Sequence, residues 1–260
     1  MNANVLGAEL YRMLRLTRSY WLEYAADFIL YFAGFLLLMA VFSASAETFS
    51  SQGVLSSLIG YVVWKICAST FLSVARIADE EARTGTLEQM FLTSQSPFHL
   101  FLARSFSIFI NQALRGMLLG LVLGAALGVL VAPTWLSILI FILTFVSALG
   151  LGLAMAGLVL INKRVGGFLT LIWQMLVFFS GALAPMPDGP LTWISRLLPL
   201  SWGVSALRSA LITGSSITDL WQTGLLPGLL LNTLVYIAVG TALFVWGERQ
   251  ARFLGVLGHY

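Results

Sequence analysis

The chain has 260 residues, of which 59% are hydrophobic and only 10% are charged, and its mean hydropathy is +0.92. A typical soluble domain carries about 25% charged residues, so this composition excludes an ordinary soluble protein and indicates an integral membrane protein. The formal net charge is +3, and the sequence shows no concentration of basic residues that would form a groove for a nucleic-acid partner.

The first predicted element is an amphipathic helix over residues 3–24. At helical spacing its apolar face carries Leu6, Leu10, Met13, Leu14, Tyr20, Trp21 and Tyr24, and its polar face carries Arg12, Arg15, Arg18 and Glu23. This separation favours a helix lying in the membrane surface, with the three arginines at anionic head groups and Trp21 at the interface. An ordinary solvated helix before the first span is the alternative.

The same region allows a second alternative, a secretory signal, because arginines precede an apolar run that ends in Ala-Ser-Ala at 44–46. The acidic residues Glu9, Glu23 and Asp27 disfavour a signal, which begins with a short basic segment. Cys67 is the sole cysteine of the sequence, so an intrachain disulfide is excluded.

Six segments are predicted to cross the membrane, because a spanning helix needs about 20 mainly apolar residues. They are residues 27–45, 54–78, 105–131, 135–161, 166–184 and 224–247.

The distribution of Lys and Arg predicts the orientation, because these residues are more frequent on the cytoplasmic side of a membrane protein. One side carries Arg12, Arg15, Arg18, Arg76, Arg83, Arg104, Lys163, Arg164, Arg249 and Arg252, and the other only Arg196 and Arg208. Both termini, including the tail 248–260, are therefore expected to be cytoplasmic.

The second predicted span contains a lysine, Lys65, near the middle of the membrane. Inserting a lysine there costs about 2.5–3.5 kcal/mol, so such a residue usually faces protein or a water-filled cavity. We expect Lys65 either to line a pathway or counter-charge a ligand, or to be snorkelled or paired within the protein.

The longest charged and polar stretch is a cytoplasmic segment, residues 79–98, which contains DEEARTGTLEQMFLTSQSP. Thr86 and Gln89 form a predicted capping box, with Gly85 in the turn before it. The short helix that begins at Leu87 would project Met90, Phe91 and Leu92 into the cytosol beside Glu81 and Glu88. Exposed apolar residues rimmed by charge indicate a protein partner. The alternative is a helix packed on its own membrane domain.

The third predicted span carries Gly116, Gly120, Gly124 and Gly128 at intervals of four, which predicts a face for close helix packing. Arg115 precedes an apolar run that can itself cover about 25 Å, and this allows Arg115 to lie at the cytoplasmic interface.

Residues 185–215 are predicted to form two short re-entrant helices on the outer side, before the last span. Leu191, Ile194, Leu197 and Leu198 have helical spacing up to Pro199, and Val204, Leu207, Leu211 and Ile212 repeat it up to Gly214. Trp193, Trp202 and Trp221 are the expected interfacial anchors.

Several catalytic motifs are absent from the sequence. It has no G-x-x-x-x-G-K-[ST] phosphate loop, since neither Lys65 nor Lys163 follows a glycine, and no H-E-x-x-H motif or His/Cys cluster beyond the isolated His99 and His259. We therefore expect no catalytic or metal site in this chain. If transport is driven by ATP, the ATPase must be another polypeptide.

Two of these segments resemble the permease subunits of type-2 ATP-binding-cassette (ABC) exporters. EARTGTLEQMFLTSQSP, residues 81–97, is similar to the family's acidic residue, Gly-Thr-Leu-Glu and Ser/Thr/Pro-rich stop. LLPLSWGVSALRSAL, residues 197–211, is similar to the family's proline-to-arginine segment and places Pro199 and Arg208. Leu198 and Trp202 depart from the Asn and Tyr that the family often has.

The resemblance implies an all-α membrane protein with one transmembrane domain over residues 1–260, formed by the interface helix, six spans, a coupling helix and the outer helices. It implies a homodimer in the cell inner membrane that docks two separate ABC ATPase subunits, which bind ATP and Mg. It also implies that the coupling region comprises Glu81, Gly85, Thr86, Leu87, Glu88 and Gln89, next to the exposed Met90 and Phe91.

We therefore expect an exporter permease that is not itself an enzyme. The candidate pathway residues are Trp64, Lys65, Trp173, Gln174, Met175, Phe178 and Phe179. Aromatic and methionine side chains suit an amphipathic or lipid-like substrate such as a drug, a lipid or a lipid-linked molecule, and Lys65 suits an anionic group. These aromatics could instead face lipid or the core. The alternative function is a nucleotide-independent channel or a membrane assembly scaffold.

Overall fold

The computed structural model describes residues 11–12, 15, 17–42, 50–84, 97–161, 166–183 and 189–253. This described part is helical and contains no β-strand, which agrees with the all-α fold class. Its helices are α2 (Trp21–Phe42), α3 (Ser51–Thr84), α5 (Pro97–Leu127), α6 (Trp135–Ile161), α7 (Gly166–Phe179), α8 (Pro190–Leu197), α9 (Ser201–Ile212), α10 (Ile217–Gln222) and α11 (Leu225–Phe253).

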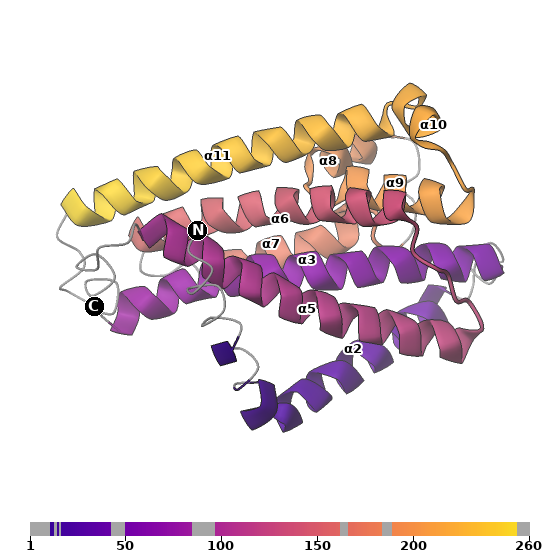
Figure 1. Cartoon of the computed structure of the whole chain (residues 1–260), viewed down its shortest axis with the longest axis horizontal. Helices are drawn as coiled ribbons and strands as arrows, with labels where there is room; N and C mark the ends of the chain where they lie inside the picture. The colour runs from indigo at the N-terminus through magenta and orange to yellow at the C-terminus, as the bar shows by residue number, and fades with distance from the viewer. Residues whose placement is uncertain are drawn as a thin grey trace.

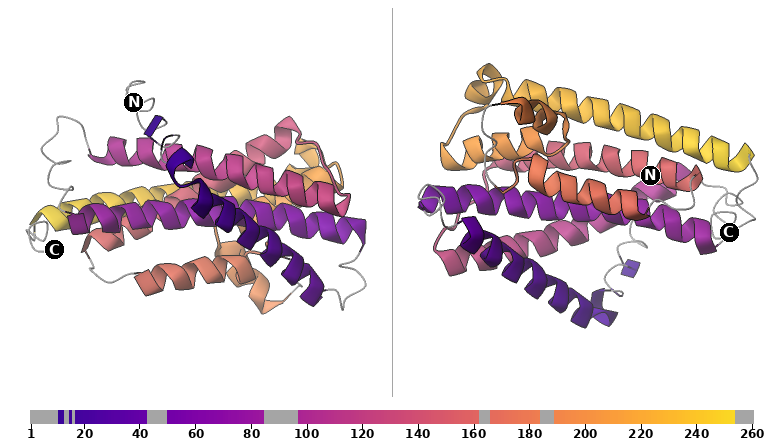
Figure 2. Two further views of the ribbon diagram at one scale, coloured as in Figure 1. Left: turned by 90° about the horizontal axis from the view of Figure 1, so that it is seen from below. Right: turned by 180° about the vertical axis from the view of Figure 1, so that it is seen from behind.

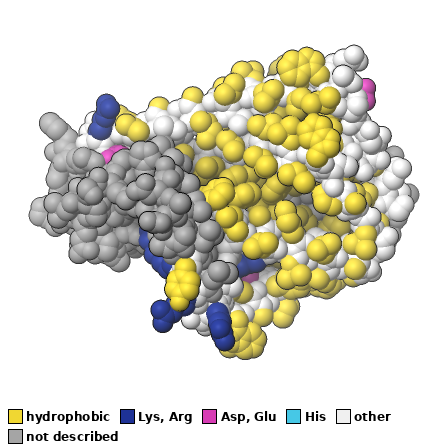
Figure 3. Space-filling view, in the orientation of Figure 1, with side chains coloured by type: hydrophobic (Ala, Val, Ile, Leu, Met, Phe, Trp, Pro, Cys, Tyr) yellow, Lys and Arg dark blue, Asp and Glu magenta, His cyan; other side chains and the backbone are white. Residues whose placement is uncertain are grey.

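Five helices of the described chain are long and apolar enough to cross a membrane. The candidate spans are Trp21–Val41, Ser51–Asp79, Ala103–Leu127, Trp135–Ile161 and Leu225–Ala251. In Figure 1, α3, α5, α6 and α11 run along the long axis of the molecule, whereas α2 crosses them obliquely. On the face shown in Figure 3, hydrophobic side chains form a broad area over the described helices, as a surface in contact with lipid requires.

The fifth predicted span, residues 166–184, differs from the structure. Helix α7 has 14 residues and ends at Phe179, so it is about 21 Å long at 1.5 Å per residue, against a hydrocarbon core of about 30 Å. The chain turns at Gly181, which has a positive φ of 71°. The Gly181 and Ala182 carbonyls accept hydrogen bonds from Arg208, and this long-range pairing takes the place of further helix.

The predicted boundary between the interface helix and the first span is also different. The chain makes a turn at Tyr20, and α2 then runs without a break from Trp21 to Phe42. Trp21 and Tyr24 therefore belong to the first candidate span. Arg12, Arg15 and Arg18 lie in helical residues before this turn and are exposed, while other residues of the predicted interface helix, including 3–10, lie outside the described residues.

The centre of the bundle is formed by α6, which packs against α3 and α11. Two glycines on α6, Gly150 and Gly157, face two on α11, Gly240 and Gly247. A Cβ atom at any of these four positions would overlap the backbone of the opposite helix. The two helices are therefore in backbone contact, which small residues permit in a lipid environment.

The glycine stripe of α5 packs as the sequence predicts at three of its four positions. Gly116, Gly120 and Gly124 face side chains of α3 that are also spaced by four residues, namely Ile66, Val62 and Leu58. Gly128 has a different role. It lies just beyond the end of α5 with φ of 70°, and the bonds from Gly128 N to Ala125 O and from Val129 N to Gly124 O close the helix as a Schellman motif.

Helices α8, α9 and α10 gather at the end of the bundle where α11 begins (Figure 1). Helices α8 and α9 lie within the segment predicted to hold two short helices, and the turn between them contains Pro199, which is buried. Helix α10 was not predicted. It begins with a capping box in which Ser216 Oγ accepts from Asp219 N at 3.3 Å, while Asp219 Oδ2 accepts from Ser216 N at 2.8 Å.

This capping box predicts a pH-dependent start of α10. Hydrogen bonds from the Ser216 hydroxyl and backbone N–H hold the pKa of Asp219 below its ordinary value. Because the folded-state pKa is the lower one, the carboxylate stabilises α10 at pH values above its ordinary pKa, and this stabilisation is lost as the pH falls through the lowered pKa. Replacing Ser216 with alanine should raise the pKa of Asp219 and move this loss to higher pH.

Hydrogen exchange of the α10 amides, followed from neutral to acidic pH, measures this effect. Ser215→Ala is the matched control, because the Ser215 hydroxyl contacts Thr213 Oγ1 rather than Asp219. Identical pH profiles for the Ser216→Ala variant and the unaltered chain would contradict the proposed linkage.

Candidate functional site

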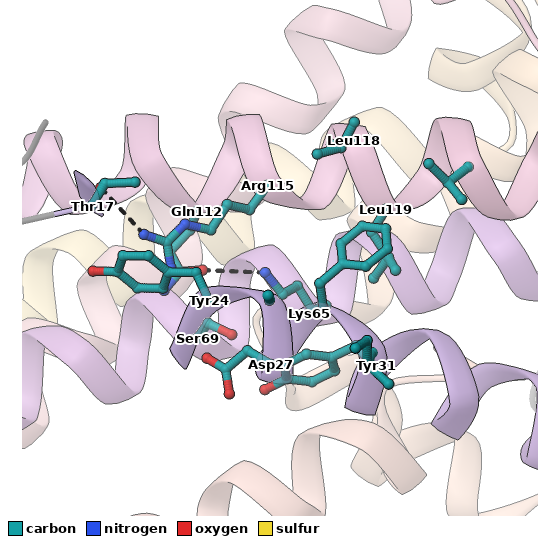
Figure 4. A pocket seen from close by; sticks show the side chains of 14 residues that line it. Thr17, Tyr24, Asp27, Tyr31, Lys65, Ser69, Gln112, Arg115, Leu118 and Leu119 are labelled. Carbon is teal, nitrogen blue, oxygen red and sulfur yellow. Dashed lines mark hydrogen bonds between the residues drawn. The ribbon is translucent and has the colours of Figure 1, made fainter. Parts of the chain in front are cut away.

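A cavity of about 470 Å³ lies between α2, α3 and α5. Its volume falls within the range of about 300–1,000 Å³ that is usual for small-molecule sites. Figure 4 shows how the three helices supply its polar wall. The polar side chains are Tyr24, Asp27 and Tyr31 from α2, Lys65 and Ser69 from α3, and Gln112 and Arg115 from α5, with Thr17 from the residues before α2.

Lys65 lies at the centre of this cavity. It is fourteen residues from each end of the candidate span Ser51–Asp79, which agrees with its predicted position near mid-membrane. Its side chain is only 6% exposed, and its Nζ donates to Gln112 Oε1 at 3.3 Å. The same Nζ lies 5.3 Å from the ring centroid of Tyr31. Lys65 therefore lines a cavity and is also hydrogen-bonded within the protein.

Arg115 lines the same cavity from α5. It is twelve residues from each end of the candidate span Ala103–Leu127, so it lies midway along that span and does not mark its end. Its guanidinium carbon is 3.3 Å from the ring centroid of Tyr24, and its Nη2 is 3.5 Å from Thr17 Oγ1. The stacking on Tyr24 fixes the plane of the guanidinium against α2.

The third charge of the cavity is Asp27, in the second turn of α2. The charges of Asp27 and Arg115 both act on the Lys65 ammonium. Among the residues that the structure describes, two cations and one carboxylate line the cavity, a net charge of about +1. Low-dielectric surroundings strengthen each of these interactions relative to water, so the cavity favours a ligand with one negative charge.

The candidate pathway residues of the second and fifth predicted spans do not form a single site. Trp64 is buried and its ring lies 5.0 Å from that of Trp173 on α7. Lys65 instead reaches the cavity between α2, α3 and α5. On α7, Gln174, Met175 and Phe178 are exposed and Phe179 is partly buried. The structure therefore pairs Trp64 with Trp173. Neither lines the charged cavity, although the Trp64 ring lies 6.4 Å from that of Tyr31, which does.

A second cavity, of about 300 Å³, lies beside α8 and α9 and is lined by Arg208, Arg196 and several Ser and Thr side chains. Arg208 is buried, and its guanidinium donates to three carbonyls, of Ser56 at 3.0 Å, Gly181 at 2.7 Å and Ala182 at 2.9 Å. These bonds tie α9 to α3 and to the turn after α7. Arg208 is thus a structural cation, held by the protein's own backbone.

The predicted tryptophan anchors divide into two groups. Trp193 and Trp221 are exposed, as interfacial residues would be. Trp202 is only partly exposed: its Nε1 donates to Arg196 O at 2.9 Å, and its ring occupies the space over Gly228 of α11. Trp202 therefore packs α9 against α11.

A family model described as the ABC-2 type transporter matches residues 6–212, which is most of the chain. The chain belongs to the ABC-2 type transporter family. A search of the curated proteins found no match. The match confirms the resemblance read from residues 81–97 and 197–211, and it identifies the chain as a multi-pass membrane component of an ABC transporter.

An ABC-2 permease does not contain its own ATPase, in agreement with the absence of a phosphate loop from the sequence. Of the predicted coupling residues, Glu81 lies in the last turn of α3. Gly85, Thr86, Leu87, Glu88, Gln89, Met90 and Phe91 lie outside the described residues. Their roles stay predictions.

Sequence reasoning missed most of the residues around Lys65 in this ABC-2 permease. Asp27, Gln112 and Tyr31 were not predicted to form a site, and Arg115 was placed at an interface. These four residues each lie inside an apolar helix. A polar or charged residue isolated among apolar ones is the signal that identified Lys65. Applied to Asp27, Gln112 and Arg115, the same criterion would have selected the cavity.

Proposed function

We propose that this chain is the permease of an ATP-driven exporter, in which two copies form the pathway and each docks one separate ABC ATPase subunit. ATP and Mg bind to the ATPase, and this chain binds neither. The substrate is amphipathic or lipid-like, such as a drug, a lipid or a lipid-linked molecule. The protein lies in the cell inner membrane with both termini cytoplasmic, and the short helix α7 supplies the sixth crossing that this orientation requires.

The observation that carries this proposal is the continuity of α3. It is a single 34-residue helix that carries Lys65 in its middle and Glu81 in its last turn. Sixteen residues of helix separate the two positions, about 24 Å at 1.5 Å per residue. A displacement imposed by an ATPase on the segment after α3 would therefore reach the cavity through one rigid element.

The test is co-purification of the detergent-solubilised chain with its candidate ATPase. A Glu88→Arg, Phe91→Asp double variant reverses the charge and removes the apolar anchor of the predicted docking helix. We expect it to lower the yield of the complex at least tenfold, about 1.4 kcal/mol or more of binding free energy, and to remove stimulation of ATP turnover. The membrane domain should elute unchanged in size-exclusion chromatography.

The matched control is Arg196→Glu with Trp193→Asp, which makes the same types of change on α8, at the other end of the bundle. Both of these side chains are exposed, and this variant should bind the ATPase as the unaltered chain does. If the docking variant retains the complex, or the unaltered chain binds no ATPase, the coupling assignment is wrong. The nucleotide-independent channel or scaffold then becomes the favoured function.

A further inference from the structure

The cavity between α2, α3 and α5 holds charged donors that the protein itself uses only in part. An ammonium group has three N–H donors and a guanidinium has five. Among the described residues, Lys65 Nζ donates one hydrogen bond, to Gln112, and Arg115 Nη2 contacts Thr17 Oγ1 at the long distance of 3.5 Å. The remaining donors lie in a cavity lined by both residues.

The placement of these two cations within the membrane is unfavourable in free energy. Each lies midway along its own candidate span, where insertion of a cation into the hydrocarbon core is disfavoured. Asp27 balances one of them, and no second carboxylate is found among the described residues that line the cavity. A bound anion would supply the missing charge.

The rest of the cavity wall is apolar and reaches the outside of the bundle. It is formed by Phe28, Ile29, Leu118, Leu119 and Val122. Ile29 and Leu118 are more than half exposed on the outer surfaces of α2 and α5, and the window of α2 that would span the membrane is almost entirely unburied within the chain. The two views in Figure 2 show α2 crossing α5 at an angle. The cavity therefore opens toward the lipid-facing side of the molecule.

We propose that this cavity binds the singly charged phosphodiester head group of an anionic membrane lipid, which enters sideways between α2 and α5. The phosphate lies against Lys65 and Arg115, where charge-assisted hydrogen bonds replace its hydration shell. The acyl chains lie along Ile29, Leu118 and Val122. This assignment deepens the proposed function, on which it rests for the role of the lipid as transported substrate, whereas the binding itself requires no ATPase.

The experiment is native mass spectrometry of the purified full chain in a non-ionic detergent, without ATPase or nucleotide. Phosphatidylglycerol and phosphatidylcholine with identical acyl chains are titrated separately. We expect one phosphatidylglycerol to be retained per chain, about tenfold more tightly than phosphatidylcholine, because one uncompensated cation in a shielded site contributes roughly that factor. Equal retention of the two lipids by the unaltered chain would overturn the proposal without reference to any variant.

Variants locate the site. Lys65→Gln and Arg115→Gln should each reduce the preference for phosphatidylglycerol to within about twofold, whereas Lys65→Arg, which keeps the charge, should retain it. Arg196→Gln is the matched control, because Arg196 lies on α8 and lines the other cavity. Retention of the full preference in both glutamine variants would place the lipid elsewhere and overturn the assignment.

Inorganic phosphate tests the source of the anion. At millimolar concentration it should leave the bound phosphatidylglycerol in place, since it lacks the apolar part that fills the rest of the cavity. Displacement at equimolar phosphate would show a site for a free anion and would overturn the lipid assignment. Because no ATPase is present, failure of this experiment leaves the docking test unaffected, and failure of the docking test leaves this one unaffected.

Discussion

Replacing Arg208 with methionine is expected to destabilise the membrane domain by about 3–5 kcal/mol, because three carbonyls lose their donor and each unsatisfied buried acceptor costs about 1–3 kcal/mol. Methionine matches the length of the side chain but donates no hydrogen bond. The carbonyls of Ser56, Gly181 and Ala182 then lose their donor. Since these three residues lie on α3 and in the turn after α7, the variant loosens α9 from both.

The measurement is thermal unfolding of the purified chain in detergent, where the apparent midpoint should fall by about 10 °C for a chain of this size. Arg208→Lys supplies the charge without the planar fork and should recover less than half of this loss. The control is Arg196→Met, because the exposed Arg196 stacks near Trp193 and Trp202 and its removal should cost less than about 1 kcal/mol. Equal effects of the two methionine variants would show that the carbonyl contacts do not stabilise the fold.

The second large effect is expected for Gly157→Leu, at the contact between α6 and α11. A Cβ atom there would overlap the Leu243 carbonyl and the Phe244 backbone. Backbone cannot rotate out of the way as a flexible side chain can, so the two helices must separate. Overpacking of this kind costs about 1–3 kcal/mol, and the loss of contacts at the paired position Gly247 adds to it.

Fluorescence-detected size-exclusion chromatography after graded heating measures this loss, together with the yield of monodisperse protein. Gly167→Leu on α7 is the matched control. It is also a glycine-to-leucine change within a helix, but a Cβ atom at Gly167 meets no atom within 4 Å. If the two leucine variants unfold at the same temperature, the close approach of α6 and α11 does not limit stability.

The sequence predicted the helices best where an apolar run has no internal break. The predicted segment 135–161 coincides with α6, because Pro133 precedes it and Asn162 and Lys163 follow it. The prediction for residues 166–184 placed the end of the helix too late, since α7 ends at Phe179. Their composition suits a full crossing, but the helix stops where Gly181 turns and Arg208 binds its carbonyl. That interaction joins residues far apart in the chain, so local composition could not reveal it.

The candidate site was predictable in its centre and not in its surroundings. Lys65 stands out because a single charge interrupts an apolar helix, and this criterion needs no knowledge of neighbouring helices. The placement of Arg115 required knowing that α5 ends at Leu127, which depends on the closing conformation of Gly128. Gln174 and Met175, which were predicted to line the pathway, are exposed on the single chain, and their role stays a prediction. A uniformly apolar helix has no periodicity that tells its buried face from its outer one.

The glycine pairs of α6 and α11 also bear on how the protein is made. The ribosome completes α6 before it has synthesised α11, so the strip of α6 that contains Gly150 and Gly157 first meets lipid tails. Helix α3, made earlier, covers another side of α6 at once. The central helix thus acquires its two neighbours at different times. Closure of the bundle is a step of biogenesis that waits for residues 225–253 to enter the bilayer.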